Sequence, residues 1–393
     1  MDIQKIRRET TGCEQLIHLN NAGAALMPAV VAAAIRDYIT KEETGGGYET
    51  ADKYSAELSE FYPCMAQLLH CRSENIAFTT NATDSFNRAL SAIPFKQGDV
   101  ILTTENDYPS NFIAFISLQK RMGIEIVTVR NTSSGETDLD DLEQKIKTHQ
   151  PRLVAVTHVP TSSGLVQPAA AIGNITKRYD TLYLLDACQS VGQLAVDATT
   201  GADFISGTFR KFLRGPRGAG FLYVSDKALQ SGLEPLFPDL RGAEWTGIHA
   251  YKHREDAKRF EDWETAYALM AGSTAAVKYL LDIGIQEVQS RNALLATYLR
   301  DQLRNMPGIQ LQDKGQHPCS IITFSIANQE PESFKQYFSA QEVNIYTTAR
   351  SSAIIDFTQK GIEWVARVSP HYYNTEAEID RFIQLLTSSG TNV

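Results

Sequence analysis

Short apolar runs alternate with longer amphipathic stretches between about residue 75 and residue 225. The apolar runs are rich in Val, Ile, Leu and aromatic residues and predict buried strands, whereas 137–149 and 169–179 have the spacing of helices. This alternation is typical of an α/β fold with a mostly parallel central sheet and helices on both faces. The predicted strands are 75–80, 99–105, 124–130, 152–159, 181–187, 203–209 and 220–224.

The C-terminal third of the chain has a different pattern. Two helical stretches, 264–282 and 287–305, precede two strand-like runs, 320–326 and 364–369, and a final helix is predicted at 375–387. This order indicates a smaller α+β domain. The predicted organisation is therefore an N-terminal segment that packs with the small domain (1–20), a large ligand-binding domain (21–262) and a small C-terminal domain (263–393).

Composition excludes several classes of function. The 393 residues carry a formal net charge of −9, which argues against nucleic acid or an anionic membrane as a partner. The N-terminus lacks the apolar core of a secretory signal, and the five cysteines form no C-x-x-C pair, so we predict a cytoplasmic protein. No H-x-x-x-H or H-E-x-x-H spacing occurs, and no metal site is predicted.

Candidate chemistry lies just after the predicted strands, where ligands bind in open α/β sheets. Asp186 follows an apolar run and needs a cation or hydrogen-bond donors to stay charged there, and Lys211 follows another strand. At Ala82 and Thr83 a turn opens a helix whose N-terminus could hold an anion. Taken alone, that turn is more typical of an ordinary helix cap by Asn81 or Thr83.

Together these residues predict pyridoxal 5′-phosphate, which carries an aldehyde, a ring nitrogen and a phosphate. The aldehyde requires a lysine and the ring nitrogen an acid, while Arg210 adds a cation for the phosphate. The glycine pattern GPRGAG at 215–220 matches neither a P-loop nor a dinucleotide fingerprint. It predicts tight turning and close packing beside the lysine instead.

The chain resembles the class V aminotransferase family of pyridoxal phosphate-dependent, fold type I enzymes, which includes cysteine desulfurases, isopenicillin N epimerases and C–S lyases. Within it, RKFLRGPRG, HVPTSSGLVQP, GGYE and RFEDWE are most similar to the hercynylcysteine sulfoxide lyase branch of ergothioneine biosynthesis, close to the epimerases. The motifs of the family resemblance span nearly the whole chain: HLNNAGAALMP, TTNATDS, DYPSN, LLDACQSVGQ, RKFLRGPRGAGFLYV, RFEDWE and RVSPHYYNTEAEID.

The resemblance implies roles for individual residues. Lys211 would bond to the cofactor and move the α-proton, with Asp186 on the ring nitrogen as the second catalytic residue. Arg367 would grip the substrate carboxylate through its two-pronged guanidinium, with Arg350 and Asn21 as further substrate contacts. Thr161 stands where many relatives have an asparagine. The implied cofactor-binding residues are Ala82, Thr83, Tyr108, Thr161, Asp186, Gln189, Thr208, Arg210 and Lys211.

Three supporting residues carry weaker expectations. Arg214 and Arg217 are predicted to be exposed or to pack between domains rather than to act in catalysis. His371 lies beside Arg367 in the sequence and is predicted to support it.

A missing cysteine narrows the expected reaction. Desulfurases of the family need a mobile nucleophilic cysteine in the stretch that corresponds to 344–357, which has none, and Cys188 and Cys319 are interpreted as packed side chains. The sequence therefore predicts a C–S lyase that eliminates sulfur from an S-substituted cysteine or its sulfoxide, giving pyruvate and ammonia. An epimerase or aminotransferase would use the same residues. A cysteine desulfurase and a non-catalytic cofactor-binding protein are less favoured.

The expected partners follow from the same resemblance. The substrate is a small amino acid, and the relatives are homodimers with the cofactor near the subunit interface. Residues 240–245 or 258–264 are expected to reach the site of the neighbouring subunit.

Overall fold

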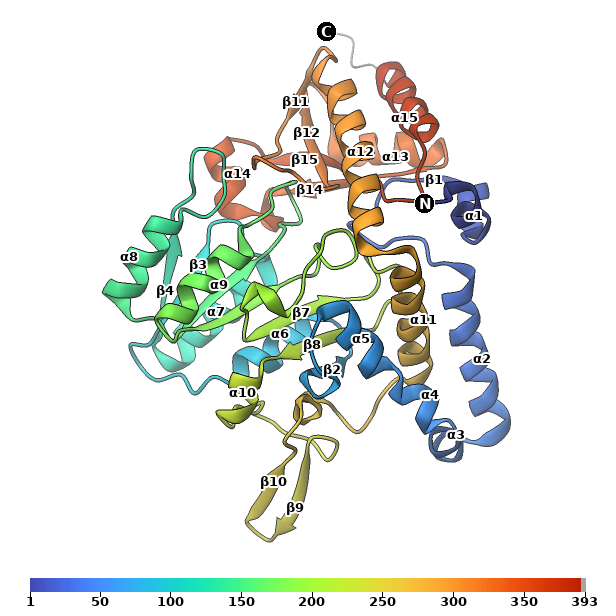
Figure 1. The fold of residues 1–393 in the computed structure, drawn as a ribbon. Helices are drawn as coiled ribbons and strands as arrows, with labels where there is room; N and C mark the ends of the chain where they lie inside the picture. Colours follow the sequence, from blue (N-terminus) through green and yellow to red (C-terminus); the bar gives the residue numbers. More distant parts are fainter. Residues whose placement is uncertain (390–393) are drawn as a thin grey trace.

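The structure is a computed structural model that describes residues 1–389. A seven-stranded sheet lies at its centre between helices, a smaller sheet lies above it in the view of Figure 1, and a two-stranded hairpin projects below. The central strands run in the order β2-β8-β7-β6-β5-β3-β4. Their bounds are β2 Ile76–Thr79, β3 Val100–Thr104, β4 Glu125–Val129, β5 Leu153–Thr157, β6 Leu182–Asp186, β7 Phe204–Thr208 and β8 Gly220–Val224.

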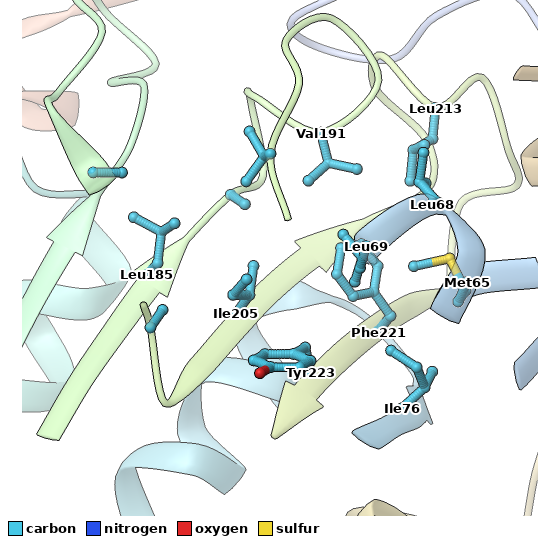
Figure 2. Close-up of a cluster of buried hydrophobic side chains, with 14 of the residues drawn as sticks. Met65, Leu68, Leu69, Ile76, Leu185, Val191, Ile205, Leu213, Phe221 and Tyr223 are labelled. Atoms are coloured by element: carbon cyan, nitrogen blue, oxygen red, sulfur yellow. The ribbon is translucent and has the colours of Figure 1, made fainter. Parts of the chain in front are cut away.

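The central sheet is mostly parallel, as the alternating pattern predicts. Only β8 runs antiparallel, to both β2 and β7. Apart from the edge strand β4, the strands are buried on both faces, so successive residues enter different apolar clusters: Leu184 belongs to one and Leu185 to the other. Figure 2 shows part of the second cluster: Leu185 lies at one end of the group, and Met65 and Leu69 of the helix Phe61–Leu69 lie near Phe221 at the other.

Helices cover both faces of this sheet (Figure 1). The two helices predicted between strands form at nearly the expected bounds, and Asp138 starts one of them by accepting hydrogen bonds from the N–H groups of Asp140 and Asp141. The helices of this part are α2 Ala29–Gly45, α3 Gly47–Lys53, α4 Ser55–Ser59, α5 Phe61–Leu69, α6 Ala82–Ser91, α7 Pro109–Met122, α8 Leu139–His149, α9 Ala169–Arg178, α10 Asp226–Gln230 and α11 Tyr267–Ile283.

The C-terminal part contains a four-stranded antiparallel sheet in the order β11-β12-β15-β14, so the predicted α+β character is confirmed. The sequence predicted only β12 and β15, because β11 and β14 are short and at most partly buried. The elements are β11 Ile309–Leu311, β12 Ile322–Ile326, β14 Tyr346–Ala349, β15 Trp364–Val368, α12 Ile285–Arg304, α13 Pro331–Ala340, α14 Ile354–Lys360 and α15 Glu376–Ser388.

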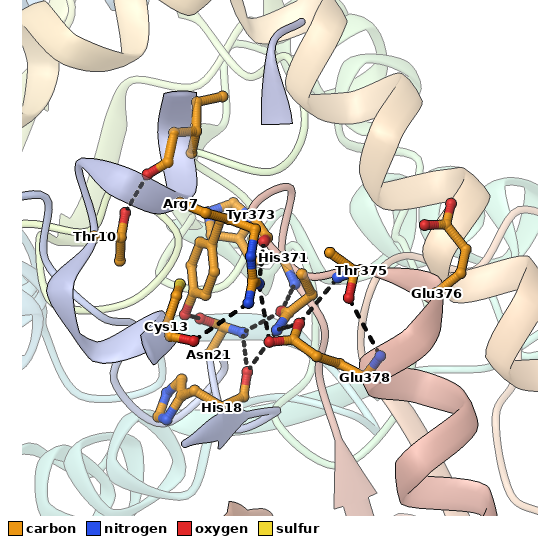
Figure 3. A network of polar contacts seen from close by, with 12 residues as sticks. Arg7, Thr10, Cys13, His18, Asn21, His371, Tyr373, Thr375, Glu376 and Glu378 are labelled. Atoms are coloured by element: carbon orange, nitrogen blue, oxygen red, sulfur yellow. Dashed lines mark hydrogen bonds and ion pairs between the residues drawn. The ribbon is translucent and has the colours of Figure 1, made fainter. Parts of the chain in front are cut away.

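The N-terminal residues contact the C-terminal part. Strand β1 (Ile17–His18) pairs in parallel with β13 (Val343–Asn344), and helix α1 (Ile3–Arg8) places Arg7 2.9 Å from the Glu378 carboxylate. Figure 3 shows the polar network that joins these segments. The division of the chain at residues 20 and 262 stays a prediction.

Strands β9 (Ala243–Gly247) and β10 (Ala250–His253) form the projecting hairpin (Figure 1). Among the described residues, no single helix has the length and apolar content to cross a membrane. Helices α11 and α12 meet that test only as a pair, with a bend of 80° between them.

Candidate active site

The carboxyl ends of β5, β6 and β7 and the N-terminus of α6 surround a cavity of about 170 Å³, which we call the inner cavity. Parallel strands that end at one edge of a sheet bring together residues that are distant in sequence. All nine residues predicted to bind the cofactor line this cavity: Ala82, Thr83, Tyr108, Thr161, Asp186, Gln189, Thr208, Arg210 and Lys211.

Asp186 ends β6 opposite Thr157 of β5 and is 4% exposed. Its carboxylate accepts hydrogen bonds from Asn111 Nδ2 at 3.1 Å and from the Cys188 N–H at 3.0 Å. These donors fix the orientation of a carboxylate that would otherwise be costly to bury. The carboxylate can therefore face a protonated ring nitrogen in the inner cavity.

A second buried carboxylate, Asp107, helps to hold Asn111, the side chain that donates to Asp186. Asn111 Nδ2 also donates to Asp107 at 2.9 Å, and Thr103 Oγ1 donates to it at 2.5 Å. Burial raises the pKa of Asp107 to about 6, although its hydrogen bonds with Thr103, Thr157 and Asn111 act in the opposite direction. The sequence gives only a loop at Asp107, and its position before a helix-opening Tyr-Pro pair is the one signal that could have marked it.

Lys211 lies just after β7 and is 7% exposed. Its Nζ has no hydrogen-bond partner within residues 1–389. Burial lowers the pKa of Lys211 to about 8, and the positive charge of Arg210 adds to this effect while Asp186 opposes it. A buried lysine amine with a lowered pKa suits both bond formation with an aldehyde and proton transfer.

His371 supports the lysine segment rather than Arg367. Its Nε2 lies 2.9 Å from the carbonyl oxygen of Phe212, and its Nδ1 lies 3.2 Å from Asn292 Oδ1. Both ring nitrogens of His371 therefore bond to groups other than Arg367, and the predicted support of Arg367 by this ring is not observed. The burial that surrounds its ring holds the pKa of His371 well below its usual range.

The N-terminus of α6 supplies an anion site. The Asn81 side chain caps the helix by accepting from the Asp84 N–H at 2.9 Å. The N–H groups of Ala82 and Thr83 have no acceptor in the described part of the chain, and they line the inner cavity. The turn therefore acts as an ordinary cap and still leaves two amides for a phosphate.

Glycine at two positions of GPRGAG shapes this region. A Cβ on Gly220 would lie 2.6 Å from the carbonyl carbon of Asn81, so only glycine lets the α6 turn sit against β8. Gly218 has φ +87°, a conformation that other residues rarely adopt. The predicted roles in turning and close packing agree with this geometry.

A larger cavity of about 560 Å³, which we call the outer cavity, shares Tyr108, Thr161, Arg210 and Lys211 with the inner one. Its remaining lining comes mainly from the N-terminal segment, from β14 with the loop that follows it, and from β15. These residues are His18, Asn20, Ala22, Gly23, Ala24, Pro109, Arg217, Tyr346, Thr348, Ser351, Ser352 and Arg367.

Arg367 lies in this outer cavity on β15. Its guanidinium donates to Thr161 Oγ1 at 2.7 Å and to Asn20 Oδ1 at 3.2 Å, and it lies 4.7 Å from the centre of the Tyr346 ring. Burial lowers the pKa of Arg367 to about 10, and Tyr346 opposes the shift. Its Nε is buried without a partner among residues 1–389, which leaves a donor for a carboxylate.

Two predicted substrate contacts lie outside both cavities. Asn21 is fully buried, donates to the Ser369 carbonyl at 2.7 Å and accepts from the Tyr373 hydroxyl at 2.5 Å (Figure 3). Arg350 instead pairs with Glu363 at 3.0 Å. Residues next to them line the outer cavity instead: Asn20, Ser351 and Ser352. Arg350, Ser351 and Ser352 form one short 3-10 helix, in which only the two serines face the cavity.

The two arginines of the glycine-rich segment differ. Arg214 is 1% exposed and donates to the Tyr372 hydroxyl at 2.8 Å and to Thr10 Oγ1 at 2.6 Å, so it packs between distant segments as expected. Arg217 is exposed but lines the outer cavity, a position that sequence reasoning missed.

These features fit pyridoxal 5′-phosphate. A buried lysine, a buried carboxylate on the adjacent strand and free amides at a helix N-terminus surround one cavity, and Gln189 Oε1 in its wall is buried without a partner among the described residues. Residues 1–389 contain no group of three or more His, Cys, Asp and Glu side chains that could hold a metal ion. Fold and site together define the class of pyridoxal phosphate-dependent, fold type I enzymes.

The chain belongs to the class V aminotransferase family, whose model matches residues 17–382. A protein of Methanothermobacter thermautotrophicus named "Probable cysteine desulfurase" is 28% identical over 388 residues, which cover 96% of each chain. Among solved structures, the apo cysteine desulfurase of Thermococcus onnurineus NA1 has a TM-score of 0.91 at 23% identity and covers 99% of this chain and 98% of its own. A complex of the cystine C–S lyase C-DES with cysteine persulfide has a TM-score of 0.85 at 21% identity and covers 96% and 98%.

Proposed function

We propose that this class V enzyme is a C–S lyase. It takes an S-substituted cysteine, or the corresponding sulfoxide, and breaks the bond between Cβ and sulfur. For the thioether, one water is consumed and a thiol, pyruvate and ammonium are formed. The proton leaves Cα, the electron pair of the Cβ–S bond leaves with sulfur, and water releases the nitrogen as ammonium.

Three residues of the chain would perform the protein's part of this reaction. Arg367 would bind the α-carboxylate through two parallel hydrogen bonds. Lys211 would take the proton from Cα at its Nζ, for which a pKa lowered to about 8 is favourable. Asp186 would keep the ring nitrogen of the cofactor protonated, and pyridoxal phosphate, when bound, supplies an electron-withdrawing ring next to Cα.

Other residues would orient the cofactor. Thr208, Arg210 and the amides of Ala82 and Thr83 would hold its phosphate, and Tyr108 would lie on the face of the ring. Gln189 would approach the ring oxygen. Its amide nitrogen Nε2 already donates to Thr161 Oγ1 at 3.2 Å and to the Ala22 carbonyl at 3.1 Å. The side-chain oxygen Oε1 is therefore the group left for the cofactor.

The observation that carries the proposal is the lack of a suitable thiol. Transfer of sulfur through the protein requires a thiolate that can reach the substrate. Residues 344–357 contain no cysteine, and this loop gives the outer cavity Ser351 and Ser352 instead. Cys188 lines the inner cavity, but burial raises the pKa of its thiol well above the usual value. It therefore stays protonated.

Cysteine desulfurase is the second candidate, because similar proteins such as that of M. thermautotrophicus carry that name. The two reactions differ in their products. A desulfurase leaves alanine, whereas β-elimination leaves pyruvate and ammonium. Epimerase and aminotransferase activities would instead give the other enantiomer or consume an oxo-acid acceptor.

The deciding experiment measures pyruvate and alanine from a panel of S-substituted cysteines, their sulfoxides and free cysteine. We expect pyruvate without alanine, and a Cys188→Ser variant whose kcat/KM stays within about threefold of the parent. The Lys211→Ala variant should lose turnover by at least about a thousandfold and should lose the covalent cofactor detected by intact mass after borohydride reduction. Alanine as the main product, abolished in Cys188→Ser, would overturn the proposal.

A homodimer is the proposed assembly. Large apolar side chains are exposed on and beside the projecting hairpin, and contiguous exposed apolar surface is typical of an interface. They include Phe237 at 83%, Trp245 at 73% and Ile248 at 84% exposure.

Three further statements stay sequence-based predictions. They are a cytoplasmic location, the lack of nucleic-acid and membrane partners, and membership of the hercynylcysteine sulfoxide lyase branch.

A further inference from the structure

The outer cavity has an unbalanced charge. Four cationic side chains line it, Arg210, Lys211, Arg217 and Arg367, and none of its lining residues is an aspartate or glutamate. The carboxylate of Asp186 lines the inner cavity instead. Clustered cations without counter-charges attract anionic ligands and raise their local concentration.

Three of these cations have a use in the proposed reaction. Lys211 would bond to the cofactor, Arg210 would lie beside its phosphate, and Arg367 would bind the α-carboxylate. Arg210 and Arg367 are also held by the protein, through the Gly23 carbonyl and through Thr161. One α-carboxylate and one phosphate therefore leave the fourth cation, Arg217, without an anion.

Arg217 differs from the other three because nothing in residues 1–389 neutralises or holds its guanidinium. Within the described residues it makes no hydrogen bond, ion pair or ring contact, and it is exposed while lining the outer cavity. Its charge is close enough to Arg210 to contribute to the lowered pKa of that residue. A guanidinium of this kind is available to a ligand.

The backbone around Arg217 is well fixed. Pro216 has a restricted φ, and Gly218 turns the chain with φ +87°. Arg214, three residues earlier, is anchored among Thr10, Leu26 and Tyr372. The segment therefore presents the Arg217 side chain from a rigid turn, which lowers the entropic cost of binding an anion there.

We propose that Arg217 binds a second anionic group of the substrate, carried by the substituent on sulfur. This inference rests on the proposed lyase function and narrows its substrate class to S-substituted cysteines with a carboxylate in the substituent. Arg367 would bind the α-carboxylate, and Arg217 would bind the carboxylate of the substituent on sulfur. The cavity volume of about 560 Å³ is within the range of sites for small ligands.

The test compares two substrates of the same shape, S-carboxymethylcysteine and its neutral amide S-carbamoylmethylcysteine. The parent enzyme should prefer the acid in kcat/KM, and Arg217→Gln should reduce that preference by about tenfold to a hundredfold, the size of one lost charge-assisted hydrogen bond. The kcat/KM of the amide with each variant is the reference value for this ratio, so the preference and not the absolute rate decides the result. Arg121→Gln removes the same charge from an exposed position outside both cavities and serves as the control.

A binding measurement keeps this test separate from the lyase proposal. In 2-aminoadipate a methylene replaces the sulfur of S-carboxymethylcysteine, so it has no leaving group, and homoglutamine is its neutral amide. Titrations followed by cofactor absorbance should show tighter binding of 2-aminoadipate, and Arg217→Gln should remove the difference.

Each outcome is distinct. Absence of pyruvate from every conjugate would overturn the lyase function, while the binding pair would still decide on Arg217. Equal preference in parent and variant would overturn the role of Arg217. Loss of bound cofactor in Arg217→Gln would assign the side chain to the phosphate instead, and loss of the dimer would assign it to a carboxylate of the second subunit; both results would reject this inference.

Discussion

The inner and outer cavities share four lining residues but are built in different ways. The inner cavity is enclosed by the ends of β5, β6 and β7 and by α6, and its carboxylate is held by donors from two segments. The outer cavity is lined by the N-terminal segment, by β14 with the loop that follows it and by β15, and no aspartate or glutamate is among its lining residues. Rigid strands thus position the groups needed for the shared chemistry, and loops provide the contacts that select a substrate.

The largest expected effect concerns the inner cavity. Asp186→Ala should lower kcat by about a hundredfold to a thousandfold, because the ring nitrogen loses the carboxylate that keeps it protonated. Steady-state kinetics with any accepted cysteine conjugate would measure this loss.

The matched control is Asp203→Ala. Asp203 is also a buried aspartate next to the central sheet, but it precedes β7 and accepts from the Tyr183 N–H at 3.0 Å. This change should lower stability and leave kcat nearly unaltered. Unchanged turnover in Asp186→Ala would contradict the prediction, because Asp186 at the cavity would then matter no more for catalysis than Asp203 at the opposite end of the sheet.

A second prediction uses the lowered pKa of Lys211 in the cofactor-free protein. Its folded-state pKa of about 8 lies below the usual value, so the folded protein binds fewer protons than the unfolded chain above that pH. The contribution of Lys211 to stability therefore rises between about pH 8 and pH 10.5. Lys211→Met should be more stable than the parent at pH 7, by on the order of 3 kcal/mol, and this advantage should shrink as pH increases.

Chemical denaturation of both proteins at pH 7, 8 and 9.5 would check this. Lys120→Met, at an exposed position on α7, should show no such trend. An advantage of Lys211→Met that stayed constant with pH would mean that the amine is not desolvated.

The smallest expected effects are those of replacing two adjacent asparagines, of which one should change KM and the other the melting temperature. Asn20→Ala removes an acceptor of the Arg367 guanidinium and should raise KM by about threefold with an unchanged melting temperature. Asn21→Ala removes buried hydrogen bonds and should lower the melting temperature by about 3 °C with an unchanged KM. Thermal denaturation and kinetics on both variants measure the pair. The reverse result would place Asn21, not Asn20, at the substrate.

The sequence predicts the inner cavity well because its residues follow buried strands. Runs such as 181–187 and 203–209 leave little freedom in where Asp186 and Lys211 lie relative to the sheet, and the structure brings all nine predicted cofactor residues to one cavity. Asp107 escaped notice because a carboxylate after a strand and before a helix looks like an ordinary loop residue.

The outer cavity is harder to predict because long-range pairing sets its geometry. Which of two neighbouring side chains faces the cavity depends on the bridge between Asn20 and Ser369, and no local pattern fixes that choice. The same applies to Arg350, whose neighbour Ser351 lines the cavity while Arg350 bonds to Glu363. Arg217 could be placed only once the turn around it was known.

The pairing of the N-terminal segment with the C-terminal strands has a consequence for biosynthesis. Asn21 leaves the ribosome early, yet its acceptor on Ser369 lies 348 positions further along the chain. Contacts of such separation form late in folding. The central sheet can therefore assemble while translation continues, but the wall formed by residues 18–24 closes only after synthesis is almost complete, so we expect nascent chains to remain catalytically silent until then.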